Sequence, residues 1–256
     1  IMINTKLIKM EENEAFALEM ASKIWKDGGL VAFPTETVYG LGANGLDEQA
    51  AVKIYAAKGR PSDNPLILHI AQKRQVRPLV KEISKVGEQL MDTFWPGPLT
   101  LIFPKADCVP YKTTGGLDTV AIRMPSHPQA RKLLEAVQLP IAAPSANLSG
   151  RPSPTTANHV WEDMNGRIDL IVDGGAVGIG VESTIIDLTE EVPTILRPGY
   201  ITKEMLEAIV GEVKIDPAIM GVLRPDIHPK APGMKYRHYA PKAPVILVEG
   251  KTDAVI

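Results

Sequence analysis

The chain has 256 residues, of which 45% are hydrophobic and 23% are charged, and this balance excludes an intrinsically disordered protein. Lysine and arginine number 28 against 30 aspartate and glutamate residues, so a net charge of -2 excludes nucleic-acid binding through bulk positive charge but leaves a local basic groove open. The one cysteine, Cys108, excludes an intrachain disulfide and a cysteine-based zinc site, which favours a reducing, cytoplasmic location.

Helix-type and strand-type patterns alternate along the chain. Phe16, Met20 and Ile24 lie four residues apart and predict a helix over residues 12–27 that ends at Gly28. Further helices are predicted at residues 47–57, 82–93, 126–137, 156–164 and 202–210. Strands are predicted at residues 30–33, 66–70, 99–103, 119–123, 141–143, 168–172, 183–188 and 193–196. Because several strands follow one another without a helix between them, we expect an α/β fold with a mixed, twisted sheet and flanking helices.

The composition changes near residue 216, because six prolines lie between Asp216 and Pro244. We therefore predict one domain over residues 10–215, an extended linker over 216–244 and, at 245–256, the first strand of a second domain that is otherwise missing or truncated. Lysines and acids interrupt the first residues, and no apolar run approaches the roughly 20 residues of a bilayer span. We expect neither a targeting signal nor a membrane contact.

The segment from Gly40 to Gly45 matches the G-x-G-x-x-G pattern of dinucleotide-binding sites. In such sites the glycines directly follow a strand and lead into a helix N-terminus, whereas here residues 34–39 separate them from the predicted strand. Two alternatives stay open: a nicotinamide site, as in an oxidoreductase, or a plain glycine turn.

Polar side chains follow several predicted strands, at the place where α/β sheets bind ligands. The segment P-T-E-T-V-Y-G-L-G starts at Pro34, and its threonines, glutamate and tyrosine favour a site over a capped loop. Ser145 and Asn147 follow another strand, where a serine-rich turn is the alternative. Arg123 and Arg197 each end an apolar strand, where pairing with a surface acid is the alternative.

The segment K-G-R-P-S-D-N-P-L, from Lys58 to Leu66, comes directly after a predicted helix. The compact charge of Lys58 and the planar fork of Arg60 together suit a polyphosphate, and a solvated helix C-terminus is the alternative. No two of the five histidines have metal-ligand spacing on a helix, and the sequence contains no G-x-S-x-G elbow and no Walker P-loop. The residues therefore indicate a basic, hydroxyl-rich cavity for anions, without a covalent nucleophile.

Several ordered motifs resemble those of the YrdC-domain threonylcarbamoyl-AMP synthases: P-T-E-T-V-Y-G-L-G, K-x-R-P-S from Lys58, and P-S-A-N ending at Asn147. The segment P-G-M-K-Y-R-H-Y-A-P at 232–241 is similar to the linker of the long, two-domain form, and the resemblance covers residues 10–244. It implies a nucleotidyltransferase that joins L-threonine, bicarbonate or CO2, and ATP into L-threonylcarbamoyladenylate and pyrophosphate. This is the first step of N6-threonylcarbamoyladenosine formation in tRNA. It further implies a large, positively charged cavity.

The resemblance also assigns residues. It implies ATP contacts for Lys58, Arg60, Ser62, Asn64, Thr119, Ser145, Asn147, Ser153, Arg197, Tyr236 and His238. It implies threonine contacts for Thr35, His69, Arg123, Ala143 and Ser183. Lys58 and Arg60 are the catalytic cations in this assignment, and Mg²⁺ comes with ATP, near Asn147.

The resemblance also implies a partner that accepts the product. The product would pass to a tRNA threonylcarbamoyl transferase complex, and a weak contact with RNA is left open. A double-stranded RNA- or tRNA-binding module without catalysis stays open as another function. For the linker, a lid over the cavity and a spacer are the two alternatives.

Overall fold

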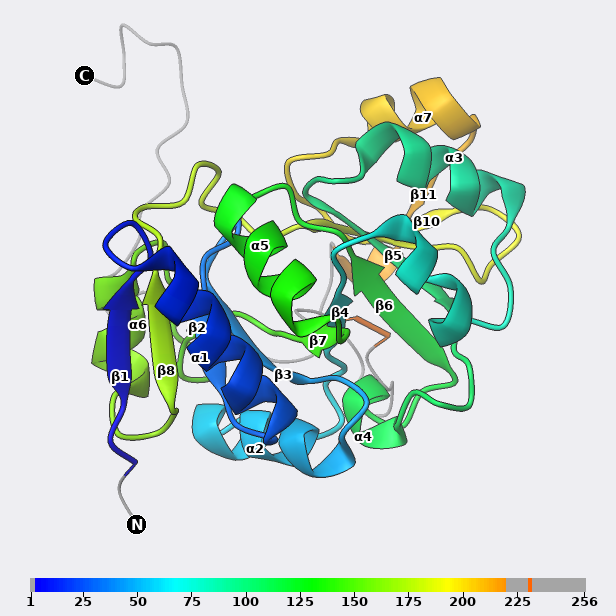
Figure 1. The fold of residues 1–256 in the computed structure, drawn as a ribbon. Coiled ribbons are helices and arrows are strands. Elements are labelled where there is room, and N and C mark those ends of the chain that lie inside the picture. Colours follow the sequence, from blue (N-terminus) through cyan, green and yellow to red (C-terminus); the bar gives the residue numbers. More distant parts are fainter. Residues whose placement is uncertain (1–2, 220–229, 232–256) are drawn as a thin grey trace, which may run out of the picture.

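Residues 3–219 and 230–231 are described by the computed structural model, and they fold around a mixed β-sheet (Figure 1). In this part of the chain the sheet has eleven strands in the order β1-β8-β2-β3-β7-β4-β6-β5-β9-β10-β11. The strands are β1 (Lys6–Lys9), β2 (Val31–Phe33), β3 (Gly40–Asn44), β4 (Ile67–His69), β5 (Leu99–Pro104), β6 (Thr119–Arg123), β7 (Ile141–Ala142), β8 (Leu170–Asp173), β9 (Thr184–Asp187), β10 (Thr194–Arg197) and β11 (Lys214–Ile215). Parallel pairs such as β4 with β6 alternate with antiparallel pairs such as β5 with β6. The expected mixed α/β fold is confirmed.

Helices cover both faces of this sheet (Figure 1). The helices are α1 (Glu14–Lys26), α2 (Glu48–Lys58), α3 (Lys85–Phe94), α4 (Tyr111–Thr114), α5 (Pro128–Val137), α6 (Ala157–Met164) and α7 (Lys203–Val210), with short 3₁₀ turns at Lys73–Gln75, Arg77–Leu79 and Pro217–Ile219. Along β2, Val31 and Phe33 pack into a core with α1 and α5, whereas Ala32 packs into the other core with α2 and α6. This alternation follows from the two-residue period of a strand and buries both faces of the sheet.

The helix α2 begins and ends where its sequence predicts. The Asp47 carboxylate accepts hydrogen bonds from the backbone N–H groups of Gln49 and Ala50, at 2.9 and 3.3 Å. Gly59 ends the helix with a φ of 61°, a left-handed conformation that favours glycine. These two caps fix Lys58 in the last turn of the helix.

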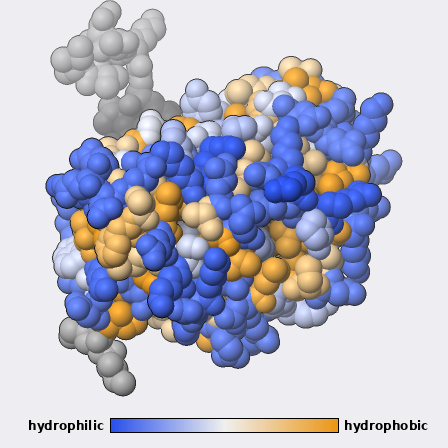
Figure 2. All heavy atoms as spheres, viewed as in Figure 1, coloured by the Kyte–Doolittle hydropathy of each residue, from blue (hydrophilic) through white to orange (hydrophobic). Residues whose placement is uncertain are grey.

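On α1 the buried side chains are Ala17, Ala21, Ser22 and Trp25, whereas Phe16 is 45% exposed. The small alanines allow α1 to pack closely against α5. Helix α5, predicted from residue 126, begins at Pro128 after the N-cap His127. Figure 2 shows that the face carrying α1 and α5 is largely hydrophilic, with hydrophobic side chains in separate patches.

The segment from Gly40 to Asn44 is neither a dinucleotide loop nor a turn, because it forms β3, antiparallel to β2. A Cβ on Gly42 would lie 2.7 Å from the Ile141 side chain and 2.9 Å from that of Phe33. The indole Nε1 of Trp25 donates to the Gly42 carbonyl at 3.0 Å. Glycine is therefore needed here for close packing, and the basis of the nicotinamide alternative is removed.

The predicted linker is described only in part. Within it, Lys230 forms ion pairs with Asp187 at 3.4 Å and Glu190 at 2.5 Å, and Ala231 is buried against the sheet beside Ile67. Tyr236, His238, the proposed lid and the strand expected after residue 244 lie outside the described residues. None of the helices in the described ranges combines the length and the apolar character needed to span a membrane.

Candidate functional site

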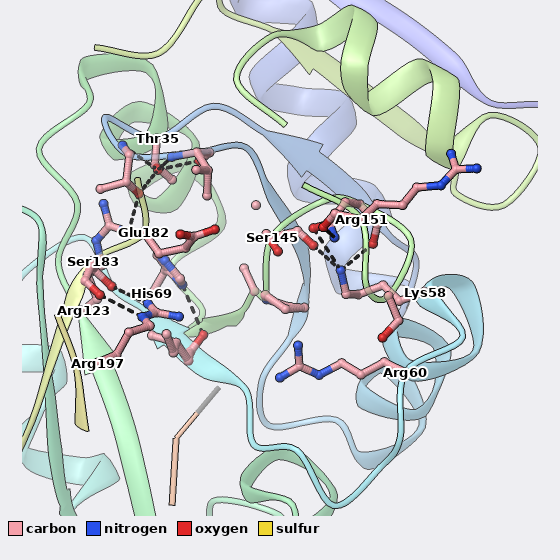
Figure 3. Close-up of a pocket in the computed structure, with 18 of the residues that line it drawn as sticks. Thr35, Lys58, Arg60, His69, Arg123, Ser145, Arg151, Glu182, Ser183 and Arg197 are labelled. Atoms are coloured by element: carbon pink, nitrogen blue, oxygen red, sulfur yellow. Dashed lines mark hydrogen bonds between the residues drawn. The ribbon is translucent and has the colours of Figure 1, made fainter. Parts of the chain in front are cut away.

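A pocket forms where the loop between β2 and β3, the loop after β7 and the segment before β9 meet the C-terminal end of α2 (Figure 3). The space between its lining atoms, including space open to solvent, is about 680 Å³. Its lining residues are Thr35, Thr37, Val38, Gly40, Lys58, Arg60, Ile67, His69, Arg123, Ala143, Pro144, Ser145, Asn147, Ser149, Gly150, Arg151, Glu182, Ser183 and Arg197.

Most of the predicted site residues that the structure describes come together in this pocket. Those that line it are Thr35, Lys58, Arg60, His69, Arg123, Ala143, Ser145, Asn147, Ser183 and Arg197. Four do not: Ser62 is exposed, Asn64 is buried beneath the loop, Thr119 lies at the start of β6, and Ser153 bonds to Glu182. The polar lining residues to which no ligand contact was assigned are Thr37, Ser149, Arg151 and Glu182. Thr37 belongs to the predicted segment that starts at Pro34, whereas the other three lie in loops close to an assigned residue.

The labelled side chains of Figure 3 form two groups across the pocket. Thr35, Arg123, Ser183 and Arg197 lie on one side, and Lys58, Arg60 and Ser145 lie on the other. An isolated bridge between Gly40 and Ser145 ties the loop after β7 to β3. Residues that are far apart in the sequence are thus held at one end of the sheet.

Lys58 connects α2 to the loop after β7. Its side chain is buried, and Nζ donates to the carbonyl oxygens of Ser145 and Asn147, both at 2.5 Å. Burial, and next the positive charge of Arg60, lower the pKa of Lys58. The lysine therefore fixes the backbone of the Ser145–Asn147 segment and adds positive charge to that side of the pocket.

Arg123 is held by a buried carboxylate, Glu36, from the segment that starts at Pro34 and was predicted to form a site. Its guanidinium forms an ion pair with Glu36 at 2.7 Å and donates from NH1 to the Thr37 hydroxyl at 2.9 Å. Burial raises the pKa of Glu36 and is the largest effect, but the Arg123 charge and several hydrogen bonds together outweigh it and lower the pKa. The alternative of a surface ion pair is wrong, since both partners are largely buried.

His69 lies on β4 beside Arg123 and is neutral. Burial, followed by the nearby Arg123 charge, lowers the pKa of His69 to about 3. Its Nδ1 lies 3.1 Å from the Ile67 carbonyl oxygen. The ring therefore supplies shape and hydrogen-bonding capacity to the pocket, and no positive charge at neutral pH.

Hydroxyl groups complete the side that contains Arg123. Arg197 donates from Nε to the Ser183 carbonyl at 3.0 Å and from NH2 to the Ser183 hydroxyl at 3.1 Å, and that hydroxyl lies 2.7 Å from the Thr100 hydroxyl. The Thr35 hydroxyl donates to the Val38 carbonyl at 2.6 Å, which braces the loop between β2 and β3. These bonds order the loops before any ligand binds.

The charge of the lining is strongly positive. Its cations are Lys58, Arg60, Arg123, Arg151 and Arg197, against the single carboxylate of Glu182. Such a surface favours phosphate and carboxylate groups, and its convergent arginines can bind them through paired N–H donors.

The described residues do not form a metal cage. They contain no cluster of three His, Cys, Asp or Glu side chains that could hold a metal ion. The Asn147 amide donates to the carbonyls of Leu148 and Arg151 at 2.8 and 2.9 Å, and its oxygen lies 3.5 Å from Lys58 Nζ. Mg²⁺ prefers carboxylates, water and substrate phosphates, so its place near Asn147 stays a prediction.

Comparison with known proteins supplies the family. The Sua5/YciO/YrdC family model, described as "Telomere recombination", matches residues 23–199. The chain belongs to this family.

A second model, "Threonylcarbamoyl-AMP synthase, C-terminal domain", matches residues 201–256. The expectation that the C-terminal domain is missing or truncated was therefore wrong. It rested on the proline-rich composition after residue 216, whereas the matched domain already begins at residue 201.

This member of the Sua5/YciO/YrdC family is similar to several named proteins. It is 56% identical over 255 residues to the threonylcarbamoyl-AMP synthase of Pyrococcus abyssi, covering 100% of this chain and 73% of that protein. It is 52% identical over 239 residues to the protein of that name from Bacillus subtilis, covering 93% and 68%. The crystal structure of P. abyssi Sua5 complexed with L-threonine superposes with a TM-score of 0.91 at 56% identity, covering 100% of this chain and 74% of that one.

Proposed function

We propose that this protein is a threonylcarbamoyl-AMP synthase, which joins L-threonine, bicarbonate or CO2, and ATP into L-threonylcarbamoyladenylate and pyrophosphate. The observation that carries the proposal is the pair of cationic groups that face each other across one pocket, Arg123 and Arg197 on one side and Lys58 and Arg60 on the other. Two anionic substrates need two such groups. High identity to proteins of this name supports the same assignment.

The reaction requires charge neutralisation more than a protein nucleophile. The threonine ammonium group and bicarbonate give a carbamate, water and a proton, and the carbamate is already an anion. One carbamate oxygen then forms a bond to the α-phosphorus of ATP as the bond to pyrophosphate breaks. Bringing two anions together in line costs electrostatic energy, which a preorganised cluster of cations offsets.

The lining residues divide between the two substrates, and Arg197, on the side of Arg123, is assigned to ATP. Thr35, His69, Arg123, Ala143 and Ser183 bind threonine in this proposal, and the Arg123 guanidinium pairs with its carboxylate. Arg60, Ser145 and Arg197 bind ATP directly. Lys58 contributes charge and also orders the Ser145–Asn147 backbone that faces the nucleotide.

The remaining assigned residues act from outside the lining or belong to the linker. Asn64 supports the loop, since its carbonyl accepts from the Tyr55 hydroxyl at 3.2 Å and from Arg60 at 3.5 Å. Ser62, Thr119, Ser153, Tyr236 and His238 stay proposed ATP contacts that require a bound nucleotide to be tested. Mg²⁺ is proposed as an ion that arrives with ATP, and no step is assigned to it.

The cellular role follows from the product. The mixed anhydride is an activated carbamoyl donor, so we propose that a tRNA threonylcarbamoyl transferase complex consumes it in the cytoplasm. The catalytic domain proposed for residues 10–215 and the linker proposed for 216–244 overlap the C-terminal domain model, which matches residues 201–256.

Pyrophosphate release tests this function. The full chain should release pyrophosphate from ATP with Mg²⁺ when L-threonine and bicarbonate are both present, and omission of either should reduce the rate to background. Hydrolysis of ATP to ADP that is indifferent to threonine would contradict the proposal. Salt-sensitive RNA binding with no pyrophosphate would support the RNA-binding module instead.

A further inference from the structure

The pocket contains a carboxylate to which the proposed roles assign no task. Glu182 lies two residues before β9, next to Ser183, and is the one acidic side chain among the lining residues, which include five cationic ones. A carboxylate in an anion-binding pocket weakens the binding of phosphates. Its presence therefore points to a ligand group of positive charge.

Glu182 differs from the other carboxylates near the pocket in its partners. Glu36 is paired with Arg123 and Asp163 with Arg151, so the protein itself neutralises their charge. Glu182 forms no ion pair with any residue of the described ranges, and one of its oxygens accepts a close hydrogen bond from the Ser153 hydroxyl. That bond orients the carboxylate and leaves its other oxygen for a ligand.

The backbone of Glu182 is fixed by its neighbours. A Cβ on Gly199 would lie 2.6 Å from the Glu182 carbonyl oxygen and 2.6 Å from the Thr184 backbone nitrogen. Gly199 therefore allows the segment after β10 to pack directly against residues 182–184. In Figure 3 the carboxylate of Glu182 points into the space between the group that contains Arg123 and the group that contains Ser145.

We propose that Glu182 binds the ammonium group of the amino-acid substrate and makes the site selective for ligands with a free amine. This inference rests on the proposed function. Threonine enters as a zwitterion, and Arg123 suits its carboxylate but would repel its ammonium. A carboxylate oriented by Ser153, on the same segment as Ser183, supplies the missing counter-charge on the threonine side of the pocket.

The test compares two ligands and two proteins. Calorimetry in the absence of ATP measures the affinity of the full chain for L-threonine and for (R)-3-hydroxybutanoate, which has the same carboxylate and hydroxyl but no amine. Glu182→Gln keeps the size of the side chain and an oxygen for Ser153, and it removes the charge. We expect L-threonine to bind this variant about 10- to 100-fold more weakly, as for the loss of one charge-assisted hydrogen bond, while the analogue binds at least as well as before.

Matched variants keep the result interpretable. Glu19→Gln, on an exposed position of α1, should leave both affinities unchanged. Glu182→Asp keeps the charge on a shorter side chain and should restore part of the preference for L-threonine. ATP affinity should be unchanged in Glu19→Gln and no weaker in Glu182→Gln, which removes a negative charge from the pocket. Thermal unfolding shows whether each variant is folded.

Three results would overturn the inference. The first is an equal loss of affinity for both ligands, and the second is unchanged threonine binding by Glu182→Gln. The third is a raised Mg²⁺ or ATP requirement with threonine affinity intact, which would make Glu182 a metal or nucleotide residue. A wild-type protein that binds threonine but makes no threonylcarbamoyladenylate would contradict the proposed function and leave the binding inference standing.

Discussion

Arg123 on β6 and Glu36 in the loop between β2 and β3 form an ion pair of 2.7 Å inside the pocket, where only 5% and 13% of their side chains are exposed. The arginine assigned to the threonine carboxylate is therefore already oriented by a carboxylate of the protein. A guanidinium has five N–H donors, so Arg123 can hold Glu36 and Thr37 and still offer donors to a ligand. Structural and ligand-binding roles are combined in one side chain and need separate measurements.

The variant Arg123→Ala should lose both roles. Removing one partner of a buried ion pair leaves Glu36 uncompensated, and the free energy of unfolding should fall by about 3–5 kcal/mol in urea titrations. The KM for threonine should rise much more than the KM for ATP.

The double variant Glu36→Gln with Arg123→Ala separates these effects. It removes the whole pair, so it should recover most of the lost stability while the KM for threonine stays high. Recovery of the threonine KM in this double variant would show that Arg123 is only the counter-ion of Glu36.

His69 should give stability a pH dependence. Its pKa is about 3 in the folded protein and ordinarily 6.5, so the unfolded chain binds a proton in this interval that the folded chain does not. Stability is fully present above about pH 6.5 and falls with pH by up to about 1.4 kcal/mol per unit toward pH 3.

Urea unfolding between about pH 6.5 and 5 measures this slope, at pH values above the range where Glu36 titrates. The variant His69→Gln should reduce the slope of the unfolding free energy against pH. The variant His159→Gln, at an exposed position, should leave this slope unchanged. An unchanged slope in His69→Gln would show that the buried imidazole takes up its proton without cost to the fold.

Lys58→Met should reduce both turnover and stability. Methionine fills a similar volume but leaves the Ser145 and Asn147 carbonyls without their donor, which costs about 1–3 kcal/mol for a buried group. Turnover should fall at least about tenfold, because positive charge near the phosphates is lost as well. The exposed Lys85→Met is the matched control. A stable Lys58→Met with a near-normal rate would remove Lys58 from the site.

Helix caps and apolar runs in the sequence predicted the helices and strands that depend on neighbouring residues in the chain. The caps at Asp47 and Gly59 defined α2 and thus the position of Lys58, and the strand β6 has the predicted bounds. Glycine has little tendency to form strands, so β3 was not predicted. It forms because Gly42 fits between Trp25 and Ile141, a contact that only the folded chain brings together.

In the site, too, contacts between residues far apart in the sequence could not be predicted. Single strand-end residues such as Arg123 and Ser145 could be identified from sequence, because polar groups after apolar strands point to a ligand site. Their partners could not: Glu36 lies 87 residues before Arg123, and Lys58 reaches carbonyl groups 87 and 89 residues away. Glu182 has no motif of its own, and only its position among the cations of the pocket makes it significant.

Detection of the product tests the central claim most directly. The full chain is incubated with ATP, Mg²⁺, L-threonine and bicarbonate labelled with carbon-13, and the mixture is examined at once by mass spectrometry. The account predicts threonylcarbamoyladenylate that carries the label in its carbamoyl carbon, with an equal amount of pyrophosphate. Release of pyrophosphate with unlabelled threonyladenylate, or consumption of ATP with no adenylate that contains threonine, would contradict it.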